Sequence, residues 1–163
     1  MVKKNKKDQT DGYIKTFQRK YMAYWLLKSE PALYSWQQLE TDGSTSWSGV
    51  RNYAARNFLR LMQPGDQAFY YHSGEGVEIV GIVRITRSFY QDPTSEDPAW
   101  VAVDVVPEKK LSKPVTLRQV KAEKRLADMR LIKISRLSVQ PVTEGEWYTV
   151  LELAGEGFEP DPK

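Results

Sequence analysis

The sequence predicts an α+β fold, in which a small and strongly curved β-sheet or barrel is flanked by short helices. Segments with strand character are scattered among short helical segments, and two of them are spaced as the arms of a hairpin. The sequence lacks the regular alternation of strand and helix that indicates a parallel α/β sheet. Because the chain has 163 residues, 40% of them apolar, we expect one domain with a single core.

The first half of the chain is predicted to contain one strand and two helices. Residues 23–29 form an apolar run with a polar end, which is typical of a buried strand. Ser35 and Gln38 have the spacing of a capping box and predict a short helix. Asn52 is positioned to cap a second helix over residues 53–62. The expected apolar stripe of that helix consists of Ala54, Phe58, Leu61 and Met62.

The second half is predicted to contain a hairpin, a further strand and two helices. Residues 66–73 and 77–86 are strand-like runs on either side of a Gly-Glu-Gly turn, which predicts the hairpin. Residues 99–106 predict the further strand, after a polar loop at 88–98. The two helices are expected to begin at capping boxes, formed by Thr116 with Gln119 and by Thr143 with Glu146.

The composition excludes several kinds of site. The sequence has no cysteine, which excludes disulfide bonds, thiolate metal sites and a cysteine nucleophile, and its single histidine excludes a multi-histidine metal site. No apolar run reaches the roughly 18 residues of a transmembrane helix. The basic N-terminus lacks the apolar stretch of a secretory signal. We expect a chain that is not secreted, located in the cytoplasm of a bacterium or in the nucleus of a eukaryote.

The net charge of +3 is unevenly distributed along the chain. Residues 1–20 carry seven basic and two acidic side chains, whereas the other residues carry 17 basic and 19 acidic ones. We interpret residues 1–21 as a basic tail, either a disordered extension or an arm that binds phosphate, and residues 156–163 as a C-terminal tail. A second basic segment lies within the domain. The residues expected to contact a nucleic-acid backbone there are Arg118, Lys121, Lys124 and Arg125.

Residues 47–57, WSGVRNYAARN, combine side chains that suit a planar ligand with polar edges. Trp47 offers a flat apolar face, and Gly49 allows a backbone or ligand to approach closely. Arg51 supplies a forked set of donors, and Asn52 supplies an amide that both donates and accepts. A nucleobase has a flat face and polar edges, so we expect this segment to line a pocket for a base.

The chain contains four motifs that resemble one family. They are YWLLKSEP (24–31), WSGVRNYAARN (47–57), FYYHS (69–73) with GIV (81–83), and RLSVQPVT (136–143) with Trp147. Together they resemble the EVE domain family over about residues 22–155. The resemblance implies a PUA-like fold, a pseudo-barrel of mixed and strongly curved sheet flanked by short helices, related to YTH and ASCH domains. It also implies binding of a modified nucleobase in DNA or RNA.

The residue chemistry and the resemblance together predict a ligand pocket. Its expected residues are Lys28, Ser29, Glu30, Trp47, Gly49, Val50, Arg51, Asn52, Tyr71, His72, Ser73, Arg136, Leu137, Ser138 and Trp147. Trp47 would stack on the base, and a Trp47→Ala substitution would abolish binding of the preferred oligonucleotide and leave the melting temperature within a few degrees. The edge of the base would be read by Ser29, Asn52, His72 and Ser138.

Structural interpretations of the same residues stay open. Trp47 and Tyr71 could belong to the core, Asn52 could act only as a helix cap, and His72 could be a structural histidine. The charged residues Glu30, Arg51 and Arg136 could form ion pairs. The other tryptophans, Trp25, Trp36 and Trp100, are expected in the core.

Three functional classes also stay open, one of which is a pure protein-interaction module. The favoured class is a binding module without cofactor or metal, a monomer or weak dimer whose partner is nucleic acid carrying a modified base, and not a membrane. The alternative is a hydrolase or glycosylase acting on a modified nucleoside, with Ser29, His72 and Glu30 as nucleophile, base and orienting group. The sequence has no Walker, Gly-x-Gly-x-x-Gly or Gly-x-Ser-x-Gly motif, which favours the binding module.

Overall fold

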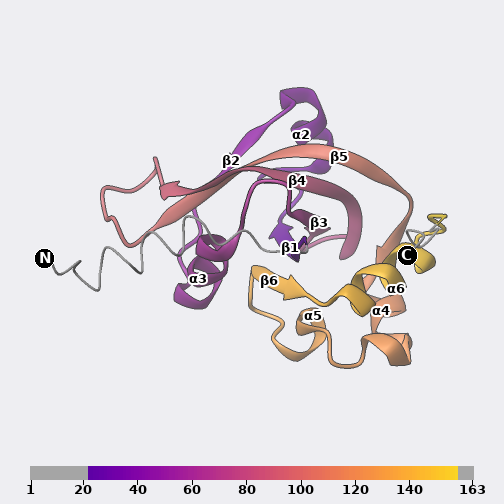
Figure 1. Cartoon of the computed structure of the whole chain (residues 1–163). Helices are drawn as coiled ribbons and strands as arrows, with labels where there is room; N and C mark the ends of the chain where they lie inside the picture. The colour runs from indigo at the N-terminus through magenta and orange to yellow at the C-terminus, as the bar shows by residue number, and fades with distance from the viewer. Residues whose placement is uncertain (1–21, 158–163) are drawn as a thin grey trace, which may run out of the picture.

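A computed structural model describes residues 22–157, in which six strands form one mixed sheet with helices on both faces (Figure 1). The strands are β1 (Tyr24–Ser29), β2 (Thr45–Trp47), β3 (Gln67–His72), β4 (Glu78–Gln91), β5 (Val101–Thr116) and β6 (Val139–Val142). The helices are α2 (Trp36–Asp42), α3 (Tyr53–Leu61), α4 (Leu117–Ala122), η1 (Lys124–Leu126), α5 (Arg130–Lys133) and α6 (Glu144–Leu153). The predicted tail at 1–21 and most of the one at 156–163 lie outside the described residues.

The sheet has the strand order β2-β5-β4-β3-β1-β6 and is strongly curved. β1 pairs with β3 in parallel, and the other pairs are antiparallel, including the predicted hairpin of β3 and β4. Four register shifts interrupt the pairing of β4 with β5, and such bulges bend the strands that contain them. The structure therefore confirms the α+β class and the mixed, curved sheet.

The long hairpin of β4 and β5 extends beyond the predicted strands. Residues 88–91, which were expected in a loop, belong to β4, and β5 continues to Thr116 through Pro107 and Pro114. β2 pairs only with residues 103–105 of β5. Beyond that point one side of β5 is an open edge, where a proline needs no backbone donor for a neighbouring strand. The two prolines are therefore compatible with a long strand.

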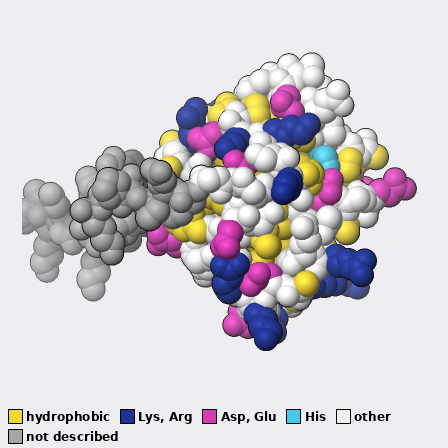
Figure 2. All heavy atoms as spheres, turned by 90° about the vertical axis from the view of Figure 1, so that its right-hand side faces the viewer, with side chains coloured by type: hydrophobic (Ala, Val, Ile, Leu, Met, Phe, Trp, Pro, Cys, Tyr) yellow, Lys and Arg dark blue, Asp and Glu magenta, His cyan; other side chains and the backbone are white. Residues whose placement is uncertain are grey.

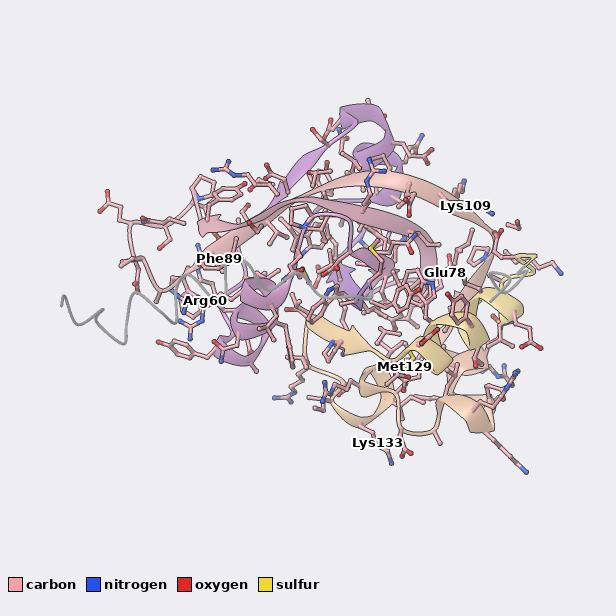
Figure 3. All side chains as sticks on the ribbon, in the orientation of Figure 1. Arg60, Glu78, Phe89, Lys109, Met129 and Lys133 are labelled. Atoms are coloured by element: carbon pink, nitrogen blue, oxygen red, sulfur yellow. The ribbon has the colours of Figure 1, made fainter. Side chains whose placement is uncertain are left out.

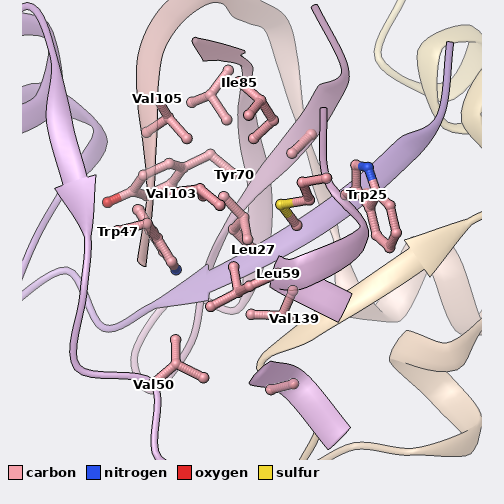
Figure 4. Close-up of a cluster of buried hydrophobic side chains, with 14 of the residues drawn as sticks. Trp25, Leu27, Trp47, Val50, Leu59, Tyr70, Ile85, Val103, Val105 and Val139 are labelled. Carbon is pink, nitrogen blue, oxygen red and sulfur yellow. The ribbon is translucent and has the colours of Figure 1, made fainter. Parts of the chain in front are cut away.

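Two hydrophobic clusters cover the two faces of the sheet. The first cluster contains Trp25, Trp36, Trp47 and Tyr70, and it packs α2 and α3 against the sheet (Figure 4). The second cluster lies on the opposite face and packs α4, η1, α5 and α6. Its members include Phe69, Tyr71 and Trp147. Successive residues of β3 alternate between the clusters, as side chains do along a strand.

Side-chain caps begin most of the helices where they were predicted. The capping boxes at Thr116 and Thr143 are confirmed with both of their hydrogen bonds, and the Asn52 side chain caps α3. The box predicted at Ser35 is only half formed: Ser35 accepts from the Gln38 backbone, but the Gln38 side chain donates to Asp42 instead.

The predicted apolar stripe of α3 was right at Phe58 and Met62 and wrong at Ala54 and Leu61. Phe58 is partly buried against the first cluster and Met62 is buried, whereas Ala54 and Leu61 are exposed; Ala55 and Leu59 are buried as well. The buried residues recur at a spacing of four and three, so they also form a continuous helical stripe. Contact of α3 with β4, β5 and β6 selects this stripe, and the neighbouring one faces outward. Within residues 22–157, no helix is long and apolar enough to cross a membrane.

Candidate functional site

A cavity of about 670 Å³ opens where the end of β1, the segment 45–51 and the turn 135–138 meet. Ten of the predicted pocket residues line it: Lys28, Ser29, Glu30, Trp47, Gly49, Val50, Arg51, Ser73, Arg136 and Ser138. The sequence analysis missed the others: Leu33, Tyr34, Thr45, Ser46, Ser48 and Ser135. Most of the missed residues are neighbours of predicted ones, so the predicted motifs identified the segments more accurately than the individual side chains.

Trp47 is one of the side chains that line the cavity. It is only 8% exposed, and its ring packs edge-to-face on Tyr70 with 5.4 Å between ring centroids (Figure 4). The Nε1–H group of Trp47 makes no hydrogen bond with the described residues, which is also true of the buried Nε1–H group of Trp36. The expected tolerance of Trp47→Ala is therefore wrong, because removing so buried a side chain leaves a core cavity that costs about 3–5 kcal/mol.

Asp92 holds the cavity loop 48–51 in place. Its carboxylate is fully buried and accepts hydrogen bonds from the Gly49 backbone at 2.7 Å and from Nη1 of Arg51 at 2.9 Å. It also accepts from the backbone and the hydroxyl of Thr94, at 2.7 and 2.6 Å. Burial alone would raise the pKa of Asp92, but these hydrogen bonds together lower it to about 2. Asp92 is thus charged, and it fixes one wall of the cavity.

Asp92 was not among the residues predicted from the sequence. Its signal was local: an Asp-Pro-Thr tripeptide, in which an aspartate accepts from the backbone two residues later. That pattern predicts the turn, but the contact with Gly49 spans 43 residues and needs the folded hairpin. The same carboxylate pairs with Arg51. Arg51 therefore forms the predicted ion pair and also lines the cavity.

The turn 135–138 forms the opposite wall and is held by β1 and β6. Nζ of Lys28 donates to the Ser135 carbonyl at 2.6 Å, and the Lys28 backbone donates to the Ser138 carbonyl at 3.0 Å. Burial lowers the pKa of Lys28. The fully buried Gln140 donates to the Leu137 carbonyl at 2.8 Å. Leu137 itself is 5% exposed and belongs to the core, so it anchors this turn without lining the cavity.

Several polar groups at the cavity are available to a ligand. The hydroxyls of Ser48, Ser73 and Ser138 make no hydrogen bond with the described residues. Ser29 is different, because its hydroxyl donates to the Tyr34 carbonyl at 2.9 Å and keeps only accepting capacity. The cavity thus combines one indole edge with unpaired donors and acceptors, which suits a flat ligand with polar edges.

The structure does not bring the remaining five predicted residues to the cavity. Asn52 uses its side-chain oxygen to cap α3 at Ala55, and Leu137 is in the core. Tyr71 and Trp147 lie in the cluster on the other face of the sheet. Trp147 stacks there on Phe69 and Tyr24, with ring centroids 3.9 and 4.5 Å away.

His72 lies in a second cavity of about 760 Å³, beside α2. Its Nε2 accepts a hydrogen bond from the Trp36 backbone at 3.1 Å, and burial lowers its pKa. Because this nitrogen is already an acceptor, it cannot take a proton from Ser29, whose hydroxyl points to Tyr34. Ser29, His72 and Glu30 are therefore not assembled as a catalytic group.

The basic residues predicted to contact a nucleic-acid backbone lie away from the cavity. Arg118 and Lys121 are on α4, and Lys124 and Arg125 are on η1; none of the four lines the cavity described above. In Figure 1, α3 lies towards the left of the molecule and α4 at the lower right. Figure 2 shows basic and acidic side chains interspersed on the face around α4 and α6. Arg125 is itself paired with Glu123 at 2.9 Å and Glu152 at 2.8 Å.

Comparisons with known proteins agree with this architecture. The EVE domain family matches residues 23–153. Thymocyte nuclear protein 1 of Gallus gallus is 38% identical over 82% of this chain and 69% of its own length. A Rhodopseudomonas palustris protein solved by NMR is 54% identical over 82% of this chain and 94% of that chain, with a TM-score of 0.79. Human THYN1, solved in complex with DNA containing 5-methylcytosine, is 33% identical over 85% of this chain and 99% of that chain, with a TM-score of 0.77.

A more distant structure bears on the fold alone. The YTH domain of Zygosaccharomyces rouxii MRB1 is 15% identical over 89% of this chain and 94% of that chain, with a TM-score of 0.56. This likeness confirms the PUA-like fold that the sequence motifs implied. The family match covers most of the sequence, and its segments are the ones that build the cavity. The chain belongs to the EVE domain family.

Proposed function

We propose that this chain binds a modified nucleobase in DNA or RNA by taking the base into the cavity beside Trp47. One observation carries the proposal: Trp47, whose indole N–H group has no partner among the described residues, lines the same cavity as Ser48, Ser73 and Ser138, whose hydroxyls also have none. The volume of about 670 Å³ is within the range of small-ligand sites. The complex of human THYN1 with DNA containing 5-methylcytosine supports the same ligand class.

Recognition requires the base to leave its stack and enter the cavity. The hydroxyls can donate to or accept from a base edge, and the carboxylate of Glu30 can accept from an exocyclic amino group such as N4 of cytosine. Leu33 and Val50 supply apolar lining for a methyl group, whose burial contributes about 0.8 kcal/mol. Trp47 contributes its indole N–H group as a hydrogen-bond donor and forms part of the cavity wall. It does not offer the open stacking face that the sequence suggested, because it is buried.

The proposed function is binding without chemistry. Ser29 and His72 are neighbours on the paired strands β1 and β3, but the Ser29 hydroxyl donates to the Tyr34 carbonyl and Nε2 of His72 accepts from the Trp36 backbone. The absence of a hydrogen bond between these two side chains supports the proposal. Incubating the protein with modified nucleosides should give no product by mass spectrometry. Turnover that disappears in a His72→Ala variant would instead favour the hydrolase or glycosylase. The relatives named thymocyte nuclear protein support a nuclear location in a eukaryote, and a bacterial chain would act in the cytoplasm.

The experiment that tests the proposal compares two buried tryptophans. The probe is a single-stranded DNA 9-mer with one central 5-methylcytosine, measured by fluorescence anisotropy against the same unmodified 9-mer. Trp47→Phe keeps an aromatic ring but removes the N–H donor at the cavity. We expect it to weaken binding of the methylated probe about tenfold or more, because a buried donor–acceptor pair is lost.

Trp25→Phe is the matched control. Trp25 belongs to the same hydrophobic cluster, but its Nε1 donates to Asp66 at 3.0 Å, and it does not line the cavity. This variant should lose stability and keep the affinity of the folded protein. Wild-type affinity in Trp47→Phe would remove the indole from the recognition mechanism.

A further inference from the structure

We infer that the nucleic-acid strand carrying the inserted base leaves the cavity across a surface of arginine and aromatic side chains on α3, β4 and the loop before β5. This α3 surface consists of Tyr53, Arg56, Arg60, Phe89 and Trp100. The inference rests on the proposed function, because it assigns a position to the polymer whose base occupies the cavity. The occupant is a single-stranded stretch of DNA or RNA that adjoins the inserted base.

The α3 surface begins at the cavity itself. The guanidinium group of Arg51, which lines the cavity, lies 5.6 Å from the centre of the Trp100 ring. The Tyr53 ring follows at 5.0 Å from Trp100, and the guanidinium group of Arg56 lies 5.0 Å from the centre of the Tyr53 ring. Arg56 is fixed there by a hydrogen bond from Nη1 to the Ala99 carbonyl at 3.1 Å. Cationic and aromatic groups thus continue from the cavity onto α3.

The helix extends this surface by one further turn. Tyr53, Arg56 and Arg60 are spaced by three and four residues, so they share one face of α3. The guanidinium group of Arg60 lies 5.6 Å from the centre of the Phe89 ring, and Figure 3 shows the two side by side, at the end of the molecule away from Lys109. Seven residues of helix rise about 10 Å, which matches about three stacked nucleotides.

Exposure and charge make this surface suitable for a nucleic-acid strand. Tyr53 is 63% exposed and Phe89 is 47% exposed, so both rings are accessible to bases. Within residues 22–157, Arg56 and Arg60 have no carboxylate within 4.0 Å. Exposed rings next to guanidinium groups that are not in ion pairs are the combination that binds single strands, since bases stack and phosphates pair with arginine.

The acidic side chains of the adjoining loop form no ion pair with Arg56 or Arg60. Asp92 is buried against Arg51, and Asp97 accepts from the Ala99 backbone at 2.9 Å. Glu96 is exposed in the same loop and is the one acidic group there without a hydrogen bond among the described residues. The five residues of the α3 surface themselves carry two positive charges and no negative charge.

The test sets this surface against the basic segment predicted from the sequence. One variant carries Arg56→Ala with Arg60→Ala, and the comparison variant carries Lys121→Ala with Lys124→Ala, which removes the same charge at the other end of the molecule. Affinity for the methylated and unmodified 9-mers is measured over a series of salt concentrations. Melting temperatures establish that both variants are folded; Arg60, Lys121 and Lys124 are exposed, and Arg56 is half-buried.

We expect the Arg56/Arg60 variant to lose about tenfold or more in affinity at low salt. Its slope of log affinity against log salt should fall by about 1.4, because each phosphate contact with a single strand contributes about 0.7. The preference for the methylated 9-mer over the unmodified one should persist, because phosphate contacts are independent of the base. A Tyr53→Ala variant should lose about tenfold with an unchanged slope, since it removes stacking alone. The Lys121/Lys124 variant should lose less than either.

The possible failures are distinct. If the wild type prefers the methylated 9-mer and the Arg56/Arg60 variant keeps its affinity and slope, the α3 surface is overturned and the proposed function stands. A larger loss in the Lys121/Lys124 variant would move the strand to α4. Equal binding of both 9-mers, with loss in the Arg56/Arg60 variant, would overturn modified-base recognition and leave the α3 surface as a nucleic-acid site. If the wild type binds neither 9-mer, both proposals fall.

Discussion

Trp47 and Trp147 occupy opposite faces of one sheet and are buried to a similar extent, at 8% and 2% exposed. Trp147 stacks on two other rings, Phe69 and Tyr24, so its aromatic surface is already used inside the protein. Trp47 meets Tyr70 by a single edge-to-face contact and lines a cavity. Neither indole N–H group has a hydrogen-bond partner among the described residues, so the position of Trp47 at a cavity separates the candidate binding residue from the structural tryptophan better than exposure does.

The largest expected effect is at the structural tryptophan. Trp147→Ala should lower the free energy of unfolding by about 3–5 kcal/mol, because it removes a fully packed aromatic side chain from the second cluster. Urea denaturation followed by circular dichroism measures this loss. Binding of the methylated 9-mer by the folded fraction should stay at the wild-type value. Weakened binding at full folding would show that the two faces of the sheet are coupled.

Asp92→Asn should have the next largest effect and should affect both stability and binding. The amide cannot reproduce the charge that accepts from Arg51, Gly49 and Thr94, so we expect a loss of about 2 kcal/mol in the free energy of unfolding. Affinity should fall as well, because the loop 48–51 loses its anchor. Asp97→Asn is the matched control in the loop that contains Asp92, because the Asp97 carboxylate accepts one exposed hydrogen bond from the Ala99 backbone. Equal effects of the two substitutions would contradict a special role for Asp92.

The same carboxylate predicts a dependence of stability on pH. The pKa of Asp92 is lowered from its ordinary value of 3.8 to about 2, so its contribution is complete above the ordinary value and is lost as the pH falls from about 5 to about 2. The loss amounts to about 2 kcal/mol. Glu156, whose pKa is also lowered to about 2 by Lys109 and Ser112, titrates in the same range.

The difference in free energy of unfolding between wild type and Asp92→Asn isolates the contribution of Asp92. That difference should shrink steadily as the pH is lowered from 6 towards 2, measured by urea denaturation at each pH. A constant difference would mean that the charge of Asp92 does not stabilise the fold.

The smallest expected effect distinguishes the two cavities. His72→Ala removes the acceptor of the Trp36 backbone N–H group and should cost about 1 kcal/mol. Affinity for the methylated 9-mer should change less than twofold, because His72 does not line the cavity beside Trp47. A loss comparable to that of Trp47→Phe would assign the ligand to the cavity beside α2.

Local patterns predicted most of the elements because the interactions that begin and end them are local. The capping boxes at Thr116 and Thr143 and the cap at Asn52 each join residues three positions apart. The hairpin of β3 and β4 follows from two strand-like runs around a glycine turn. The segments that line the cavity were also predicted, although only as stretches of sequence, and the roles of their side chains are still proposals.

The facing of individual side chains could not be predicted in the same way. In FYYH, Tyr70 faces the first cluster and Tyr71 the second, and the pairing with β4 shifts register between these two residues. An alternating pattern indicates that neighbours face opposite sides, but it does not indicate which side carries the cavity. The prediction chose Tyr71 and Trp147, whereas the cavity adjoins the cluster that contains Tyr70 and Trp47.

The sequence by itself determined the fold class, the caps, the hairpin and the family, because these depend on residue types a few positions apart or on complete motifs. The tertiary structure alone decided which indole lines the cavity and which carboxylate holds the cavity loop. Both are properties of contacts between residues tens of positions apart, such as Gly49 with Asp92. Such contacts exist only after the curved sheet has brought β2, the β4–β5 hairpin and the turn before β6 together.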